Sequence, residues 1–203
     1  MKENEFYKNL SKKLGRSNFK KVQDARVGLA GLGGLGSNCA LNLVRVGFRK
    51  LTIVDFDVID PSNLDRQFYF LDQVGMEKTG ALEENLCRIN PDLDIKSIKA
   101  KIYKENAGEI FADCPIVAEC LDSAENKSML VGSLLGSGKF IVSASGLGGY
   151  GASDEIKVRK VKDGLVIVGD LESDICSKPA FSPRVNIAAA KQADTILEYV
   201  LSK

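Results

Sequence analysis

The sequence has no histidine among its 203 residues. This absence excludes Ser-His-Asp and Cys-His nucleophile pairs, together with any zinc site built on imidazole. The five cysteines are odd in number and never spaced C-x-x-C, so neither a disulfide framework nor a zinc ribbon is indicated. We therefore expect a protein of the reducing cytoplasm whose chemistry proceeds without imidazole.

Long apolar runs and an excess of one charge are also missing. No segment approaches the roughly 20 apolar residues that a membrane span needs, so we expect neither export nor membrane insertion. The 28 Lys and Arg against 27 Asp and Glu give a formal net charge of +1. This balance removes the composition-level case for nucleic acid or an anionic membrane as a partner. Any phosphate site must be local.

The pattern of apolar residues predicts one α/β domain over residues 1–203. Short apolar runs alternate with amphipathic stretches, which is typical of parallel strands joined by helices in a doubly wound, Rossmann-like sheet. The expected strands are 26–30, 51–55, 93–98, 116–120 and 140–143. The expected helices end near residue 46 or span 77–89, 104–112 and 125–135.

The two ends of the chain depart from this alternation. Residues 1–24 predict a helical arm that lies against the main body or serves as a dimer arm. Residues 156–161 and 165–168 predict a hairpin around Asp163 and Gly164, hence a small antiparallel edge. The polar segment 170–183 contains two prolines and predicts a mobile loop, and an Ala-rich helix follows over 184–201.

A glycine motif indicates a nucleotide site. Gly31, Gly33 and Gly36 satisfy G-x-G-x-x-G directly after a strand and before a helix, and Asp55 ends the next strand nineteen positions later. The glycines allow close backbone approach, the helix N-terminus offers N–H groups to phosphate, and Asp55 can accept hydrogen bonds from ribose. The alternative is a glycine turn that only packs helix on strand.

Further polar residues follow other strands of the predicted sheet. Asn63, Arg66 and Gln67 share one face of a helical turn, Lys78 opens the next helix, and Asp122 follows the fourth strand. Ligands bind at this carboxyl edge in doubly wound sheets, so we expect these side chains around one nucleotide. Taken singly, Asn63 could cap a turn, Arg66 and Lys78 could be solvated charges, and Asp122 could cap a helix.

Together these motifs resemble the ThiF/MoeB/HesA family, relatives of the ubiquitin-activating enzymes. The resemblance covers about residues 24–151 strongly and the C-terminal helix weakly. It is carried in order by Gly31-Leu-Gly-Gly34-Leu-Gly36, Asp55-Phe-Asp57, Asn63-Leu-Asp-Arg66-Gln67, Lys78, Asn90-Pro91 and Cys120-Leu-Asp122.

The resemblance implies a function and a cytoplasmic homodimer. Members of this family use ATP and Mg²⁺ to adenylate the C-terminal glycine of a ubiquitin-like sulfur carrier, and the short ThiF-like form implies a ThiS-like carrier of thiamine biosynthesis. Arg66, Lys78 and Asp122 would be catalytic, with Asp122 on the metal. Nucleotide would contact Gly31, Gly33, Gly34, Gly36, Asp55 at the ribose, Asp57, Asn63, Arg66 and Lys78 at the phosphates, and Gln67, which shapes the site.

The chemistry suits these residue types. A carboxylate that attacks the α-phosphorus is already ionised at neutral pH, so positioning and charge neutralisation suffice. An NAD(P)-dependent oxidoreductase is a rival supported by the glycine motif and Asp55 alone. It leaves without roles Asn63, Arg66, Lys78 and Asp122. A second rival is a non-catalytic, nucleotide-binding subunit that docks a carrier. A third is activation of a carboxylate on tRNA or on a peptide.

The sequence departs from the family pattern in three places. The paired C-x-x-C motifs that hold zinc in many relatives are missing, so we expect no zinc. Relatives supply an arginine in trans from an N-terminal stretch, where the nearest cations here are Lys8 and Arg16. Cys176 lies in the predicted loop where some relatives keep a covalent cysteine, with two acidic neighbours and Lys178 acting oppositely on its pKa. It is a covalent acceptor or an ordinary loop thiol.

The other four cysteines and one aromatic cluster have less specific interpretations. We expect Cys39, Cys87, Cys114 and Cys120 to be small buried apolar residues. Phe68 to Phe70 indicates core or a dimer interface rather than a carrier-binding patch.

Overall fold

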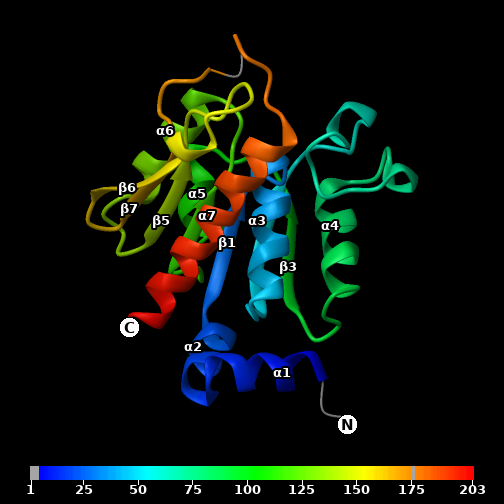
Figure 1. The fold of residues 1–203 in the computed structure, drawn as a ribbon, viewed down its shortest axis with the longest axis vertical. Helices are drawn as coiled ribbons and strands as arrows, with labels where there is room; N and C mark the ends of the chain where they lie inside the picture. Colours follow the sequence, from blue (N-terminus) through cyan, green and yellow to red (C-terminus); the bar gives the residue numbers. More distant parts are fainter. Residues whose placement is uncertain (1–4, 175–176) are drawn as a thin grey trace.

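The computed structural model of the chain describes residues 5–174 and 177–203 and contains a seven-stranded sheet (Figure 1). Its strand order is β3-β2-β1-β4-β5-β7-β6, and only the pairing of β6 with β7 is antiparallel. The strands are β1 Arg26–Ala30, β2 Lys50–Asp55, β3 Asp94–Lys99, β4 Ile116–Glu119, β5 Phe140–Ala144, β6 Lys157–Lys162 and β7 Leu165–Gly169. The predicted doubly wound, mostly parallel sheet with a small antiparallel edge is confirmed.

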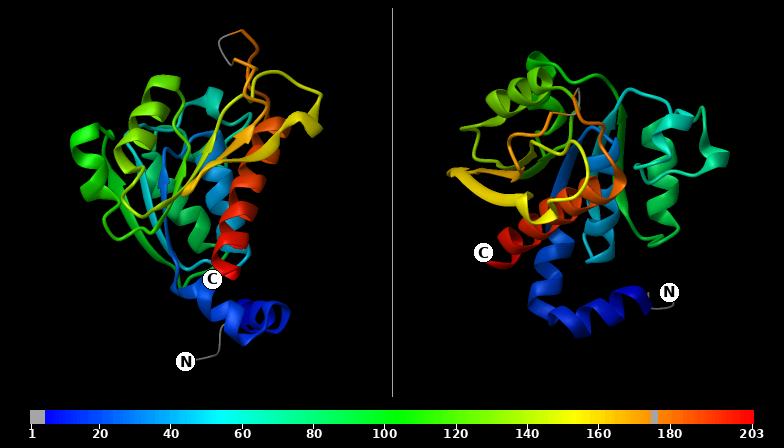
Figure 2. Two further views of the ribbon diagram at one scale, coloured as in Figure 1. Left: turned by 90° about the vertical axis from the view of Figure 1, so that its left-hand side faces the viewer. Right: turned by 45° about the horizontal axis from the view of Figure 1, so that its top comes forward.

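Helices cover both faces of this sheet (Figure 2). The α-helices are α1 Glu5–Leu14, α2 Arg16–Asp24, α3 Gly34–Arg45, α4 Lys78–Cys87, α5 Lys104–Ile110, α6 Ala124–Leu134 and α7 Ser182–Leu201. Short 3-10 turns occur at Pro61–Asn63, Leu71–Gln73 and Ser153–Glu155. None of the helices in the described part of the chain is long and apolar enough to cross a membrane.

Two apolar cores lie between the sheet and its helices. On one face, α3, α4 and α7 pack side chains such as Leu43, Leu82 and Ile196 onto the strands. On the other face, Phe111, directly after α5, and Leu130 of α6 pack onto the strands. The sequences of the central strands β1 and β4 are almost continuously apolar, because both faces of these strands are buried.

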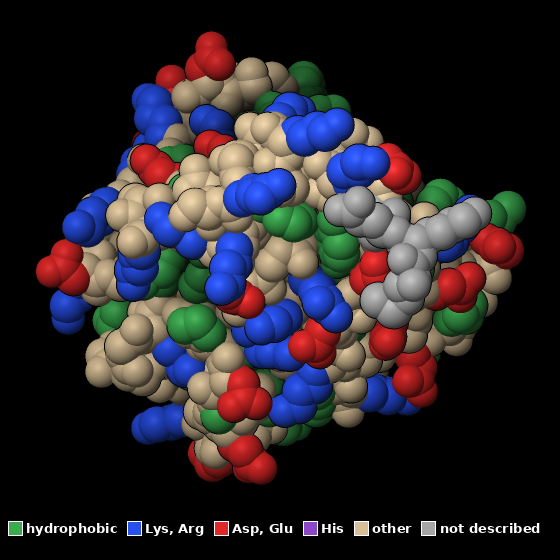
Figure 3. Space-filling view, turned by 90° about the horizontal axis from the view of Figure 1, so that it is seen from below, with side chains coloured by type: hydrophobic (Ala, Val, Ile, Leu, Met, Phe, Trp, Pro, Cys, Tyr) green, Lys and Arg blue, Asp and Glu red, His purple; other side chains and the backbone are tan. Residues whose placement is uncertain are grey.

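The predicted arm forms two helices, because Gly15 adopts a φ of 79° between them. The Tyr7 hydroxyl accepts a hydrogen bond from Asn90 at 2.7 Å, and the Tyr7 ring packs edge-on against Phe19. The arm lies at the lower end of the sheet in Figure 1, opposite the glycine loop, and Lys and Arg side chains gather on that face in Figure 3. The helices α1 and α2, which carry Lys8 and Arg16, therefore lie at the opposite end of the sheet from the glycine loop.

Candidate functional site

The glycine loop connects β1 to α3 in a tight turn. Gly31 has a φ of 88°, in the region that favours glycine, and its N–H donates to the Val54 carbonyl at 2.9 Å. A Cβ on Gly36 would lie 1.8 Å from the Gly31 carbonyl oxygen. The first turn of α3 can close on the loop only because Gly36 has no side chain.

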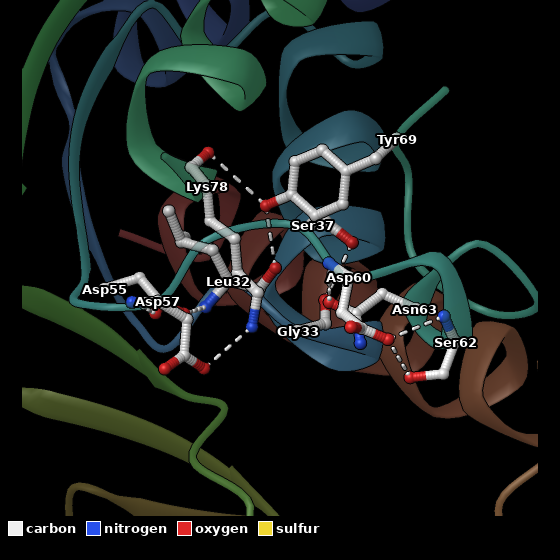
Figure 4. Close-up of polar contacts among 10 residues, drawn as sticks. All are labelled: Leu32, Gly33, Ser37, Asp55, Asp57, Asp60, Ser62, Asn63, Tyr69 and Lys78. Atoms are coloured by element: carbon white, nitrogen blue, oxygen red, sulfur yellow. Dashed lines mark hydrogen bonds and ion pairs between the residues drawn. The ribbon is translucent and has the colours of Figure 1, made fainter. Parts of the chain in front are cut away.

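Asp55 holds the glycine loop from the neighbouring strand (Figure 4). Its Oδ2 accepts the Leu32 N–H at 2.6 Å, and its Oδ1 accepts the Asp57 N–H at 2.8 Å. The Tyr69 hydroxyl donates to the Leu32 carbonyl at 2.9 Å, and burial, with the nearby Asp55 charge, raises the pKa of Tyr69. Asp55, for which the sequence predicts ribose binding, thus also determines the shape of the loop.

A cavity of about 860 Å³ opens at the carboxyl edge of the strands beside this loop. Its wall includes the following predicted residues: Gly31, Gly33, Gly34, Asp55, Asp57, Asn63, Arg66, Gln67, Lys78 and Asp122. Gly36 is buried beneath the loop and does not line the cavity. The structure therefore brings the predicted site together around one space, with Gly36 acting through backbone packing.

Lys78 is a buried cation at the cavity wall. Its Nζ lies 2.8 Å from Asp57 Oδ2, and its side chain is only 7% exposed. The alternative interpretation of Lys78 as a solvated charge is therefore wrong. Burial fixes the ammonium group where α4 begins, next to the end of β2.

Asn63, Arg66 and Gln67 form the predicted single turn. The Arg66 and Gln67 N–H groups donate to the Asn63 carbonyl at 3.2 and 2.9 Å. The Asn63 side chain accepts the Asp60 N–H at 3.1 Å, so it does cap a turn, and the Ser62 hydroxyl and N–H lower the pKa of the exposed Asp60. The turn places all three residues at the cavity wall.

Arg66 and Gln67 differ in how their polar groups are satisfied. Arg66 Nη1 donates to Asp65 Oδ1 at 2.7 Å and to the Ser62 carbonyl at 3.1 Å. Gln67 Oε1 is buried and has no hydrogen-bond partner in the described part of the chain. Since an unsatisfied buried acceptor costs about 1–3 kcal/mol, a donor at this position would be favourable.

Asp122 follows β4, and its side chain is exposed at the cavity wall. The N-cap of α6 is Ser123, whose hydroxyl accepts the Asn126 N–H at 3.2 Å. The alternative interpretation of Asp122 as a helix cap is therefore wrong. Its carboxylate is available to a ligand.

Comparison with known proteins places the chain in a family. A model of the ThiF family matches residues 7–164, which is most of the chain. The chain belongs to the ThiF family. The resemblance stated from the sequence motifs is thereby confirmed.

The chain's ThiF-family relatives include proteins that are much longer. It is 37% identical over 138 residues to the adenylyltransferase and sulfurtransferase UBA4 of Eremothecium gossypii, covering 68% of this chain and 31% of that protein. It is 35% identical over 111 residues to the molybdopterin-synthase adenylyltransferase of Haemophilus influenzae, covering 54% of this chain and 46% of that protein. The chain thus spans less than half the length of each.

Solved structures show the same fold at lower identity. The tRNA N6-threonylcarbamoyladenosine dehydratase TcdA of E. coli, in complex with ATP, superposes with a TM-score of 0.89 at 19% identity, covering 98% of this chain and 94% of that chain. The E. coli protein MccB with ATP superposes with a TM-score of 0.75 at 20% identity, covering 98% and 64%. These likenesses establish the ThiF-family fold.

The sequence-based prediction missed two cations at the wall of this cavity. Lys127, in the first turn of α6, lines the cavity and bonds both carboxylate oxygens of Glu119 at 3.2 Å. Lys101, after β3, also lines the cavity and lies 5.6 Å from the centre of the Phe56 ring. The sequence did contain a signal for Lys127. It lies five positions after Asp122, and both residues lie near the start of the helix that follows the fourth strand.

Segment 170–183 contributes to the cavity wall and is tied to the body at both ends. Asp170 Oδ2 bonds Arg184 Nη2 at 2.6 Å, and Arg184 Nη1 donates to the Gly151 carbonyl at 2.7 Å. The Gly149 N–H donates to the Pro179 carbonyl at 2.9 Å. The predicted mobility of the segment stays a prediction, and Cys176 lies outside the described residues.

Replacing Arg184 by Met should lower the free energy of unfolding by about 3 kcal/mol, because it leaves the largely buried Asp170 carboxylate without its cation. Urea denaturation monitored by circular dichroism measures this. Replacing Glu155 by Gln breaks an ion pair to Lys157 that is exposed on both sides, and should change nothing measurable. An equal free energy of unfolding in the Arg184 variant and the wild type would show that the Asp170–Arg184 ion pair does not stabilise the protein.

The ion pair between Asp170 and Arg184 also makes the free energy of unfolding depend on pH. Burial alone would raise the pKa of Asp170, but N–H groups of Ser173 and Glu172 and the charge of Arg184 hold it below its usual value of 3.8. The stabilisation is therefore present at neutral pH and is lost as the pH falls through the folded-state pKa.

The described cysteines are mostly buried, as expected. Cys39, Cys114 and Cys120 are buried, while Cys87 is half-buried on α4. Burial raises the pKa of Cys39 to about 12 and raises the pKa of Cys120 as well. These thiols stay protonated at neutral pH and are packing groups.

Proposed function

We propose that the chain catalyses ATP-dependent adenylation of the C-terminal glycine carboxylate of a ubiquitin-like sulfur carrier, in thiamine biosynthesis with a ThiS-like carrier. The main support is that one cavity combines a glycine loop, a helix N-terminus, Arg66, Lys78 and Asp122. Relatives at 32–37% identity include proteins named as adenylyltransferases, as a SUMO-activating enzyme subunit 2 and as a ubiquitin-like modifier-activating enzyme 5.

In this proposal each group has a binding or orienting role. Backbone N–H groups at the start of α3 face the phosphates, and Asp55, whose oxygens each retain a lone pair, accepts ribose hydroxyls. Asn63 and Gln67 complete the wall, and the buried Gln67 Oε1 gains a donor when nucleotide binds. Arg66 and Lys78 neutralise phosphate charge.

The proposed reaction needs no general base in the protein. A carrier carboxylate oxygen attacks the α-phosphorus, the bond from the α-phosphorus to the bridging oxygen breaks, and pyrophosphate leaves with that electron pair. The attacking carboxylate is ionised at neutral pH. Arg66 and Lys78 hold the triphosphate in place and stabilise the charge that develops on pyrophosphate.

Asp122 is the residue that would hold magnesium. Mg²⁺ binds through one or two carboxylates together with substrate phosphates and water, and Asp122 offers hard oxygen ligands at the cavity wall. No group of three or more metal-binding side chains occurs in the described ranges, so phosphate oxygens would supply further ligands. When bound, the ion neutralises part of the triphosphate charge.

ATP-pyrophosphate exchange tests the proposal directly. Purified protein with Mg²⁺ and a ThiS-like carrier ending in Gly-Gly should incorporate labelled pyrophosphate into ATP. Replacing Asp122 by Ala should reduce this exchange by at least about 100-fold, the size of effect found for groups that stabilise developing charge. A carrier truncated by its last two glycines is the matched control and should support no exchange.

Three outcomes would favour the rivals. ATP and carrier binding without exchange would indicate a non-catalytic subunit. ATP turnover that depends on tRNA or a peptide and ignores the carrier would reassign the substrate. Binding of NAD(P) that survives Arg66→Ala would favour the oxidoreductase, in which Arg66 has no role.

A further inference from the structure

Glu119, the last residue of β4, is a fully buried carboxylate just behind the cavity wall. Its Oε2 accepts the Ser143 hydroxyl at 2.5 Å, and its Oε1 accepts the Leu121 N–H at 2.7 Å. Lys127 Nζ bonds both oxygens at 3.2 Å. One carboxylate therefore joins the ends of β4 and β5 to the first turn of α6.

A buried carboxylate is an unfavourable choice if its only purpose is to stabilise the fold. Removing a carboxylate from water is unfavourable, and a buried ion pair is often no more stabilising than apolar side chains of the same volume. The neighbouring positions of β4, Ile116 to Ala118, are apolar and buried. Glu119 thus interrupts an apolar strand where the strand meets the cavity.

The bonds of Glu119 converge on the segment that carries Asp122. Leu121 immediately precedes Asp122, and both line the cavity together with Lys127. The Asp122 side chain itself makes no hydrogen bond or ion pair within residues 5–174 and 177–203. Its placement therefore depends on the backbone of the Cys120–Asp122 turn, which Glu119 fixes at the Leu121 N–H.

We propose that Glu119 is a positioning residue for the adenylation site. Its carboxylate holds the Leu121 N–H and the Lys127 ammonium, and so presents Asp122 and Lys127 to the nucleotide without touching it. This inference rests on the proposed function where it is tested by the rate of pyrophosphate exchange. Where it is tested by the affinity for ATP, it does not require that the protein turn over.

Replacing Glu119 by Gln keeps the side-chain volume and one carbonyl acceptor but removes the charge that orients Lys127. Loss of an outer partner of a ligating group costs about 10- to 100-fold in affinity or activity. We expect a loss of that size in the kcat of pyrophosphate exchange, together with weaker ATP binding in the presence of Mg²⁺ by isothermal titration calorimetry.

A mutant cycle separates positioning from general damage. If Glu119 acts through Asp122 and Lys127, adding Glu119→Gln to the Asp122→Ala, Lys127→Ala variant should not weaken ATP binding with Mg²⁺ any further. A further loss of ATP affinity on adding Glu119→Gln to that variant would overturn the inference. So would wild-type kcat and ATP affinity in Glu119→Gln. If the wild type shows no exchange, the proposed function fails, while the binding cycle still decides the role of Glu119.

Two further variants distinguish a loss of ATP affinity caused by Glu119 from a general loss of stability. Ser143→Ala removes one bond to the Glu119 carboxylate and should give a smaller loss in the same direction. Gln192→Met removes bonds to the backbone carbonyls of Glu119 and Val142, at 3.1 and 3.0 Å, without touching the carboxylate. Gln192→Met should lower the melting temperature yet leave ATP affinity unchanged. Equal ATP affinity losses in Gln192→Met and Glu119→Gln would overturn the inference.

Discussion

Replacing Lys78 by Ala is expected to lower the kcat of pyrophosphate exchange by about 10²- to 10³-fold, the effect of removing one group that stabilises developing charge. The ammonium is buried at the cavity wall, so bulk water screens it little. The substitution also leaves the Asp57 carboxylate unpaired beside the triphosphate. Both effects act in the same direction.

Lys99 provides the matched control for Lys78. It pairs with Glu77, directly before Lys78, at 2.7 Å, but the side chains of Lys99 and Glu77 are both about half exposed, and Lys99 does not line the cavity. Lys99→Ala should therefore leave exchange within about twofold of wild type, as exposed pairs contribute little. Exchange by Lys78→Ala at a wild-type rate would remove Lys78 from the catalytic set.

Replacing Gly36 by Ala is expected to destabilise the protein by about 3 kcal/mol or more and to abolish measurable ATP binding. The new Cβ would lie 1.8 Å from the Gly31 carbonyl oxygen, and both are backbone-fixed, so the loop or the first turn of α3 must move. Urea denaturation and calorimetric titration with ATP measure the two effects separately.

Gly80 in α4 is the control for this substitution. A Cβ there meets nothing within 4 Å. Because Ala is the better helix former, Gly80→Ala should stabilise the protein by about 0.5–1 kcal/mol and leave ATP binding intact. Normal ATP binding by Gly36→Ala would contradict the tight closure of the loop that the structure shows.

Much of the fold could be predicted because the local patterns are strong. The apolar run of β1, the glycines after it and Asp55 at the end of β2 all lie within 30 residues. Each of these features is required by the backbone geometry of a strand, a tight turn and a helix in succession. The strands of a parallel sheet end at one edge, so Asn63, Lys78 and Asp122 were expected near the same space.

Other features could not be predicted because they depend on contacts between distant segments. The pairing of Asp170 with Arg184 and the Gly151 carbonyl joins three segments that no local pattern connects. The hydrogen bond from the Leu32 N–H to the Asp55 carboxylate depends on how β2 lies beside the loop after β1. Burial of Lys78 is likewise set by packing, since a lysine at a helix start is usually exposed.

The charges at the cavity wall have a consequence for the kinetics of nucleotide capture. Four cations line the cavity, against six carboxylates from Asp55, Asp57, Asp65, Asp122, Glu172 and Asp174. Three of the cations, Arg66, Lys78 and Lys127, are already neutralised by Asp65, Asp57 and Glu119. A polyanion approaching from solution meets no net positive charge at this wall, so under the proposed function we expect ATP to associate without electrostatic steering. Selection for the triphosphate would then depend on contacts made inside the cavity.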